Sequence, residues 1–597
     1  MQVIRPSGDV SFPDNPGQRL FVQLWYSMVH RGSLDSHRVR CMDSLNITRE
    51  LQTLFSKPPQ KVETDIQRVA GEALQILSAD RSLKKHFHSH FARIQPLLEH
   101  LAVKATRPNL IDYYLRDLVT DLEARYKSCI LDDLELAIFH EGSDEKIREL
   151  TGVLLTRLVD EGQTLESLFN IGRYILLGRD DAFTEFRERF SRLRSVVTRQ
   201  PSNHSLVFRL SGFHKPGEAL PQLPGLKLRP TWKTPPDCSI PEHAEQRVKE
   251  FLSPDTHAFA TIQITAWDDR AAGRSGRSRL ESALDLLRFE REAGPIVVDN
   301  HFLSIRESDS IARVYEIPRA IPNPTRRVRL ADFHQFVADT TGVLQSQILD
   351  GPSREKIRSA LRFYRMGRDA AESTNKLVNW WTALEYLVRT GGQGSIGDVV
   401  ITRLAPILTL HYLPKHLEDA RETMGRFAID PHQSTQDQYG VSAYAQLKVA
   451  DLFDVLRSEK ERNHIVKSLK QLQPAFVHIL ERLWNGISDP PNLLSLLSGH
   501  QQRVEWHIHR IYRGRCDIVH SAEHSLDLTL LSANLEYYVK VILTVVLEEL
   551  RRNPEVGSLQ EVYDRISETH RCLLEDLKQN GVAVLLAVLN QGILGAV

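Results

Sequence analysis

Residues 506–524 have the sequence WHIHRIYRGRCDIVHSAEH, and this stretch is the most informative part of the chain. Val504, Ile508 and Ile511 recur at spacings of four and three, which is typical of the buried face of an α-helix. Arg515 continues the same stripe. A guanidinium that enters an apolar stripe needs a carboxylate, an interface or a phosphate as its partner. Arg515 is therefore the first candidate for a functional residue.

A histidine follows on the same predicted helix. His520 lies five residues after Arg515, with Asp517 between them. Arg513 and His520 are seven residues apart and would share one face of a continuous helix, although Gly514 can loosen that helix locally. Histidine exchanges a proton near neutral pH, and arginine holds a phosphate through two hydrogen bonds. The segment thus combines groups suited to chemistry at a phosphate.

The regions around this segment are also predicted to be helical. Residues 1–200 and 330–553 show apolar residues every three or four positions, and the clearest stripe runs from Leu528 to Val545. Pro554 prevents much continuation of that helix. The apolar end of the chain, after residue 580, is short for a membrane span, so we expect residues 554–597 to be a helical tail that docks on the body.

The middle of the chain has a different character. Residues 205–210, 258–267, 295–305 and 312–318 are rich in β-branched and aromatic residues and are predicted to be strands, with a helix at 278–291. Prolines are dense between 201 and 241 and again at 317–327, which indicates loops or linkers. The arginines and glycines of 270–279 lack the spacing of a phosphate-binding loop and predict a mobile basic loop. We expect a small α+β domain at 201–325 in a mainly α protein.

The segment Arg515-Cys-Asp-Ile-Val-His520 resembles the R-x4-H motif of HEPN proteins, which are helical-bundle domains and often ribonucleases. Its surroundings resemble the Apea-like HEPN group. That group has an aromatic helix with a leucine–glutamate pair, here Trp380-Trp381-Thr-Ala-Leu384-Glu385, and a tyrosine and arginine before the motif, here Tyr512 and Arg513. The resemblance covers about residues 350–553 and implies that 330–553 is a HEPN-like helical bundle.

The resemblance implies a metal-independent endoribonuclease that cleaves RNA through attack by the 2′-hydroxyl group. Arg515 and His520 would be its catalytic residues, with Glu385, Arg513 and Asp517 in support. One base removes the 2′-hydroxyl proton, and one acid protonates the 5′-oxygen. HEPN nucleases juxtapose the motifs of two subunits, which implies a homodimer through this domain. Apea-like HEPN proteins are associated with bacterial defence against phages, which implies a toxin-like role.

Three alternatives remain open at this stage. A HEPN scaffold that only binds RNA or a protein is favoured by Cys516, because HEPN nucleases usually have a polar residue after the arginine. A purely structural Arg515–Glu385 ion pair is the second alternative. A metal site built from His507, His509, His520 and His524 is the third, but neither a nearby cysteine nor a clear carboxylate partner supports it. We therefore predict no metal and no cofactor.

A second basic stretch lies at 354–365. Arg354, Arg358 and Arg365 fall on one face of a predicted helix and can follow an RNA backbone, or they can form an ordinary solvated face.

Composition limits the other possibilities. Hydrophobic residues are 41% and charged residues 25% of the 597, which excludes a disordered chain, a collagen-like chain and a multi-span membrane protein. Basic and acidic residues balance at 76 each, so any RNA-binding charge must be local. Five scattered cysteines favour a reducing cytoplasm. We expect RNA as the partner, no membrane, and residues 1–330 as a sensor or regulator that answers a phage-derived trigger or a regulatory partner.

Overall fold

The computed structural model describes residues 12–591, except 31–41, 58–62, 105–109, 179–184, 213–222, 224, 254–257, 291–295, 318–329, 371, 390–394 and 522–527. The expected linker at 317–327 lies almost entirely outside the described residues. So do His524 and the side chain of His520.

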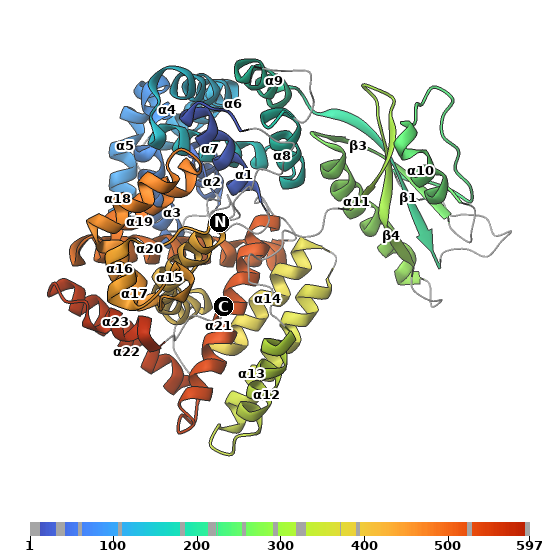
Figure 1. The fold of residues 1–597 in the computed structure, drawn as a ribbon. Helices are drawn as coiled ribbons and strands as arrows, with labels where there is room; N and C mark the ends of the chain where they lie inside the picture. Colours follow the sequence, from blue (N-terminus) through green and yellow to red (C-terminus); the bar gives the residue numbers. More distant parts are fainter. Residues whose placement is uncertain are drawn as a thin grey trace. The chain divides into compact units, whose positions relative to one another are not determined.

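The chain forms two compact units (Figure 1). Residues 1–156 and 321–597 make the first unit, and residues 157–320 make the second. The protein is mainly α with one small antiparallel sheet in the middle of the chain, which confirms the predicted fold class. The units do not follow the 200/201 boundary expected from the prolines, because the end of α7 and helices α8 and α9 belong with the sheet.

The first unit combines the N-terminal helices with helices from the C-terminal half of the chain. Its N-terminal helices pack on helices from the C-terminal half, with α1 against α19 and α3 against α20. Gln23 on α1, for example, donates a hydrogen bond to the carbonyl oxygen of Leu472 at 2.9 Å. The N-terminal helices are α1 (Pro16–Val29), α2 (Ser44–Ser56), α3 (Glu63–Ala79), α4 (Arg81–His86), α5 (His88–Val103), α6 (Ile111–Leu136) and α7 (Asp144–Asp160).

The described residues of the C-terminal part of this unit form helices joined by short turns and loops. Helix α14 packs against α13 and α21, and α15 packs against α20 and α22. The helices are α12 (Leu330–Gln345), α13 (Gly351–Asp369), α14 (Ser373–Val388), α15 (Ile396–Arg426), α16 (Gln433–Tyr439), α17 (Val449–Arg457), α18 (Glu459–Leu469), α19 (Pro474–Ile487), α20 (Pro490–Ser521), α21 (Leu528–Arg552), α22 (Leu559–Lys578) and α23 (Ala583–Gln591).

Two of these helices, α15 and α21, are long and apolar enough to cross a membrane. Their apolar windows are 56% and 72% buried inside the structure, as expected for the core helices of a bundle. The C-terminal helix α23 packs on α17 and α22, as the docked-helix interpretation predicts.

The second unit is an antiparallel sheet with the order β2-β3-β1-β4-β5. Its strands are β1 (Ser202–Ser211), β2 (Lys227–Arg229), β3 (Ala258–Ala266), β4 (Val297–Arg306) and β5 (Ala312–Glu316). Helix α11 (Asp269–Glu290) covers one face through a core that includes Phe208 and Phe302, and α10 (Glu245–Phe251) packs on the other through Val248 and Phe251. Helices α8 (Leu165–Ile171) and α9 (Phe186–Thr198) precede β1.

Two expectations for this unit are wrong. Residues 270–279 are not a mobile loop but the first turns of α11, which begins at Asp269. The proline-rich stretch 201–241 is not only loops around the predicted strand β1, because it also contains the short strand β2, which was not predicted. In both places the packing of the sheet decided a structure that the local composition disfavours.

The glycines of α11 explain why this helix can lie so close to the sheet. A Cβ atom at Gly273 would lie 2.2 Å from the ring of Phe302 on β4. We expect Gly273→Ala to destabilise the second unit by about 1–3 kcal/mol, because the crowded ring must move out of its packing. Thermal unfolding measures this cost. Ser278→Ala, at an exposed site on the same helix, should change stability by less than about 0.5 kcal/mol; equal effects would contradict the packing argument.

Candidate functional site

Helix α20 carries the predicted motif. It is one continuous helix from Pro490 to Ser521, so Gly514 does not interrupt it. Val504, Ile508 and Ile511 are buried, which confirms the apolar stripe. The helix contacts α3, α14, α15, α19, α21 and α22, and this surrounding shell fixes where each polar side chain of the motif lies.

Arg515 lies beside α14. Its Nη2 atom is 3.8 Å from Oε1 of Glu385, and the two side chains keep 23% and 15% of their surface exposed. Glu385 also accepts a hydrogen bond of 2.8 Å from Nε1 of Trp381. The Nε atom of Arg515 is buried and has no hydrogen-bond partner among the described residues. The guanidinium therefore has donor capacity that Glu385 does not use.

Aromatic contacts hold this part of α20 in place. The rings of Tyr512 and Trp381 lie 5.4 Å apart, between α20 and α14. On α15, a Cβ atom at Gly397 would lie 2.8 Å from the Tyr512 ring, so only glycine allows this close approach. Burial and the adjacent thiol of Cys516 raise the pKa of Tyr512. Cys516, the residue that departs from the pattern of the HEPN motif, is thus a neighbour of a half-buried tyrosine.

Helical geometry separates the two motif residues. Positions five apart on an α-helix differ by about 140° around the axis, so Arg515 and position 520 lie on different sides of α20. Positions seven apart differ by only roughly 20°, which places position 520 on the face that carries Arg513. The structure therefore pairs Arg515 with Glu385 but directs Arg513 and position 520 elsewhere.

The face of α20 that carries Arg513 meets the N-terminal helices in a group of buried charges, here called the Glu50 cluster. Glu50 on α2 accepts hydrogen bonds from Nε of Arg510, at 2.9 Å, and from Arg513. Arg510 also donates to Glu72 on α3 at 2.5 Å. Asp65 on α3 lies 3.5 Å from Arg513. Four of these five side chains are at most 11% exposed, and Asp65 is more open.

The cluster contains three carboxylates and two guanidinium groups. Burial alone would raise the pKa of Glu50, but the charges of Arg510 and Arg513 outweigh it and lower the pKa. Glu50 is therefore an anion held between two cations. A buried ion that keeps its charge in this way depends on its partners, since each ion alone would be costly to desolvate.

Further contacts extend the same interface. Lys57, just after α2, pairs with Asp517 at 2.9 Å. Arg68 on α3 pairs with Asp398 on α15 at 3.0 Å and contacts Nδ1 of His509 at 3.1 Å. Arg513 and Asp517, both predicted as supporting residues, thus bind the N-terminal region and not Glu385.

The other histidines of the segment have separate partners. His507 contacts the hydroxyl of Tyr538 at 2.8 Å, and burial lowers its pKa to about 3. Burial and the charge of Arg68 lower the pKa of His509 to about 4. Both are neutral at physiological pH. Within the described part of the chain, no group of three His, Cys, Asp or Glu side chains is placed to hold a metal ion.

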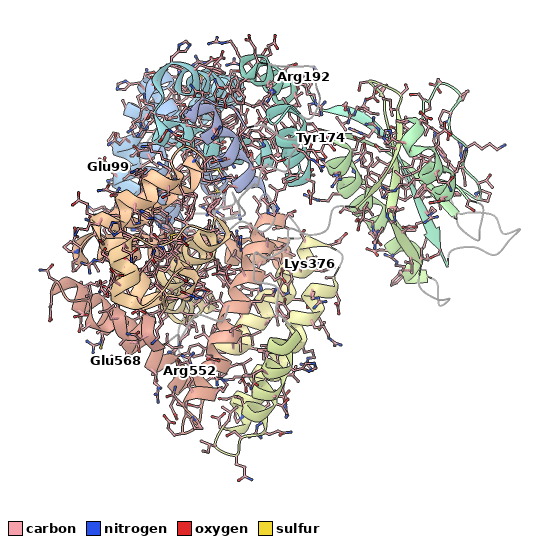
Figure 2. The ribbon with its side chains drawn as sticks, viewed as in Figure 1. Glu99, Tyr174, Arg192, Lys376, Arg552 and Glu568 are labelled. Atoms are coloured by element: carbon pink, nitrogen blue, oxygen red, sulfur yellow. The ribbon has the colours of Figure 1, made fainter. Side chains whose placement is uncertain are left out.

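The three arginines of α13 that were predicted to bind RNA divide into two kinds. Arg354 donates hydrogen bonds to the carbonyl oxygens of Ser346 and Leu349, at 2.7 and 2.8 Å, and so holds the preceding loop. Arg358 and Arg365 are exposed. Helix α13 is fixed to α14 by Lys376, which is labelled in Figure 2 and whose Nζ reaches the carbonyl oxygens of Gly367 and Arg368 at 3.4 and 3.3 Å.

Sequence reasoning missed Glu50, Asp65 and Glu72. All three lie in ordinary amphipathic helices, and their partners are more than 400 residues away. Only a search for acidic residues on the buried faces of α2 and α3 could have singled them out.

Comparison with known proteins adds no relative. No protein-family model, curated protein or solved structure matches this chain. The resemblance to HEPN proteins therefore depends on the sequence motifs alone.

Proposed function

We propose that this chain is a metal-independent endoribonuclease of the HEPN type, with Arg515 and His520 as its catalytic residues. The observation that carries the proposal is the state of Arg515. Its guanidinium is only partly exposed, its carboxylate neighbour is 3.8 Å away, and its Nε donor lacks a partner among the described residues. A partly exposed arginine with one unused donor is suited to a phosphate.

We also propose a homodimer, which the angle between the two motif positions supports. Because Arg515 and position 520 are about 140° apart on one helix, a single copy does not direct both toward the same point. Two copies that place their α20 helices side by side can direct the arginine of one and the histidine of the other into one cleft. The proposal therefore includes a homodimer through residues 330–553.

The N-terminal helices are the proposed regulator. Helices α2 and α3 cover the face of α20 that carries Arg513, and position 520 falls on the same face. Movement of these helices would change access to that face, which gives the N-terminal region a direct route to the site. We also propose that the protein acts in antiphage defence, and that it does so in the cytoplasm and not at a membrane.

The test is incubation of the purified full-length protein with total RNA in the presence of a chelator. We expect fragments that end in a 2′,3′-cyclic phosphate and a 5′-hydroxyl, because the 2′-oxygen displaces the 5′-oxygen at phosphorus. A DNA strand of the same sequence lacks that hydroxyl and should remain intact. Failure of the chelated protein to cut any RNA would contradict the metal-independent mechanism.

The alternative is a HEPN-like scaffold that binds RNA or a protein without cutting it. The ion pair between Arg515 and Glu385 favours this alternative, since the pair has a purely structural use. Only the nuclease should cut RNA in the cleavage assay. RNA binding by itself does not distinguish the nuclease from a scaffold that binds RNA.

RNA binding is expected to involve the exposed arginines of α13. Replacing both Arg358 and Arg365 by alanine should weaken binding and lower the slope of log K against log salt concentration by roughly 1.4, about 0.7 for each lost phosphate contact on a single strand. Fluorescence anisotropy across a salt series measures both. Arg571→Ala is the control, because this exposed arginine is paired with Glu568 and Glu575 on α22; an equal loss there would refute the assignment to α13.

A further inference from the structure

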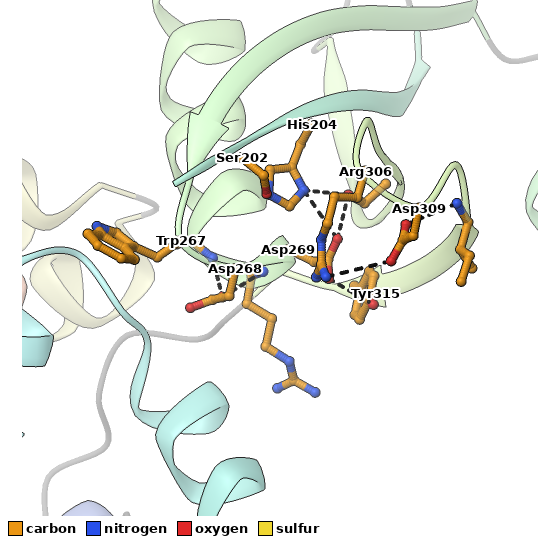
Figure 3. A network of polar contacts seen from close by, with 12 residues as sticks. Ser202, His204, Trp267, Asp268, Asp269, Arg306, Asp309 and Tyr315 are labelled. Atoms are coloured by element: carbon orange, nitrogen blue, oxygen red, sulfur yellow. Dashed lines mark hydrogen bonds and ion pairs between the residues drawn. The ribbon is translucent and has the colours of Figure 1, made fainter. Parts of the chain in front are cut away.

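Three side chains in the second unit form a line of hydrogen bonds at one end of the sheet (Figure 3). The Oγ atom of Ser202 lies 3.2 Å from Nε2 of His204, and Nδ1 of the same ring lies 3.2 Å from Oδ1 of Asp269. Ser202 and His204 are two residues apart on β1, so both side chains lie on one face of the strand. Asp269 is the first residue of α11, which packs on that face. The order is hydroxyl, imidazole and carboxylate.

The carboxylate of this line is firmly ionised. Asp269 accepts hydrogen bonds from Ser304 at 2.9 Å, Arg306 at 2.6 Å and Tyr315 at 3.1 Å. Burial alone would raise the pKa of Asp269, but the hydrogen bond from His204 and the charge of Arg306 hold it well below its usual range. An ionised Asp269 has only acceptors to offer, and it therefore selects the tautomer of His204 with its proton on Nδ1. The lone pair of Nε2 then points to the hydroxyl of Ser202.

Ser202 is more exposed than the buried His204 behind it. His204 is fully buried, and the Asp269 side chain is 13% exposed. Ser202 is half-buried at the start of β1, where the sheet ends. A small molecule in solution therefore meets the serine first, with the base and the carboxylate behind it. A nucleophile, a base and a group that orients the base are recognised by this mutual geometry and not by sequence order.

We propose that Ser202 is a nucleophile activated by His204 and Asp269, and that the second unit transfers acyl groups from small carboxylic esters to water. The Oγ atom attacks the ester carbonyl carbon while Nε2 of His204 takes the Oγ proton. The bond between this carbon and the alcohol oxygen breaks, and the alcohol leaves with the proton from Nε2. Water then attacks the carbonyl carbon of the acyl-serine while Nε2 of His204 takes a proton from the water. The bond between this carbon and Oγ breaks, Nε2 returns the proton to Oγ, and the carboxylic acid leaves. Asp269 stays ionised and stabilises the imidazolium at each step.

This activity is independent of the proposed ribonuclease, since it uses none of the residues of α20. The first test is treatment of the full-length protein with a fluorophosphonate probe, which forms a stable bond with an activated serine. Peptide mass spectrometry should find the adduct on Ser202, and Ser202→Ala should lose it completely. Ser205 lies on the same strand, is also half-buried and faces the opposite side from His204, so it serves as an internal control. No adduct at Ser202, or equal adducts on Ser202 and Ser205, would overturn the proposal.

A second test does not depend on turnover. In Ser202→Cys, the imidazole of His204 should stabilise the thiolate, so alkylation by iodoacetamide should reach half its maximal rate at least about one pH unit below the value of 8.5 for an ordinary cysteine. In Ser205→Cys the midpoint should stay near the ordinary value. The modified peptides identify each site among the native cysteines. The same midpoint in both variants would show that His204 does not activate position 202.

Discussion

His520→Ala is expected to lower the rate of RNA cleavage by roughly 10²–10⁴-fold, because proton transfer by one histidine contributes about that much to such a reaction. The melting temperature should stay close to that of the wild type. Cleavage of a labelled RNA by purified full-length protein, together with thermal unfolding, measures both quantities.

Two variants make this result specific. Arg515→Lys should also be severe, because lysine keeps the positive charge but loses the pair of parallel donors that holds a phosphate. His88→Ala is the matched control, since His88 is an exposed histidine on α5. A His520→Ala protein that melts normally and cuts RNA at the wild-type rate would refute the catalytic assignment and leave the scaffold as the better interpretation.

Glu50→Gln is expected to have the largest effect on stability. Glutamine keeps the shape of the side chain but removes the anion between Arg510 and Arg513, which leaves Arg510 with Glu72 alone and Arg513 with the more exposed Asp65 alone. Breaking a buried pair from one side costs about 3–5 kcal/mol. Urea unfolding should detect this loss as an earlier transition of the first unit.

The control for this prediction is an exposed ion pair between Arg49, one residue earlier on α2, and Glu123 on α6. Arg49 pairs with Glu123 at 2.7 Å, but both side chains are more than 40% exposed. Glu123→Ala should cost less than about 1 kcal/mol, because water screens an exposed pair. Equal losses from the two variants would mean that burial does not determine the contribution of the Glu50 cluster.

The same cluster predicts a dependence on pH. The pKa of Glu50 in the folded protein lies below its ordinary value of 4.5. Its contribution to stability is therefore complete above about pH 4.5 and is lost as the pH falls through the lower folded value. In Glu50→Gln this part of the acid sensitivity should be absent.

If α2 and α3 restrain the nuclease, the Glu50→Gln variant should also cut RNA faster than the wild type at temperatures below its unfolding transition.

The sequence by itself determined the elements that depend on neighbouring residues. The apolar stripe of Val504, Ile508 and Ile511 predicted a helix, and the structure has that helix with those residues buried. The β-branched runs predicted four of the five strands. Period and composition are local properties, since they express how one segment divides its side chains between water and a core.

Tertiary structure decided the polar partners. Glu50 meets Arg510 across 460 residues, and His204 meets Asp269 only because α11 begins where β1 and β3 lie side by side. Packing also made a helix of residues 270–279, where Gly273 lets the backbone approach Phe302. A charge or a hydroxyl on a helix or strand looks the same in sequence whether it faces water or a buried partner. The role of such a side chain depends on burial, because only in the interior does an unpaired polar group cost enough free energy to require a particular neighbour.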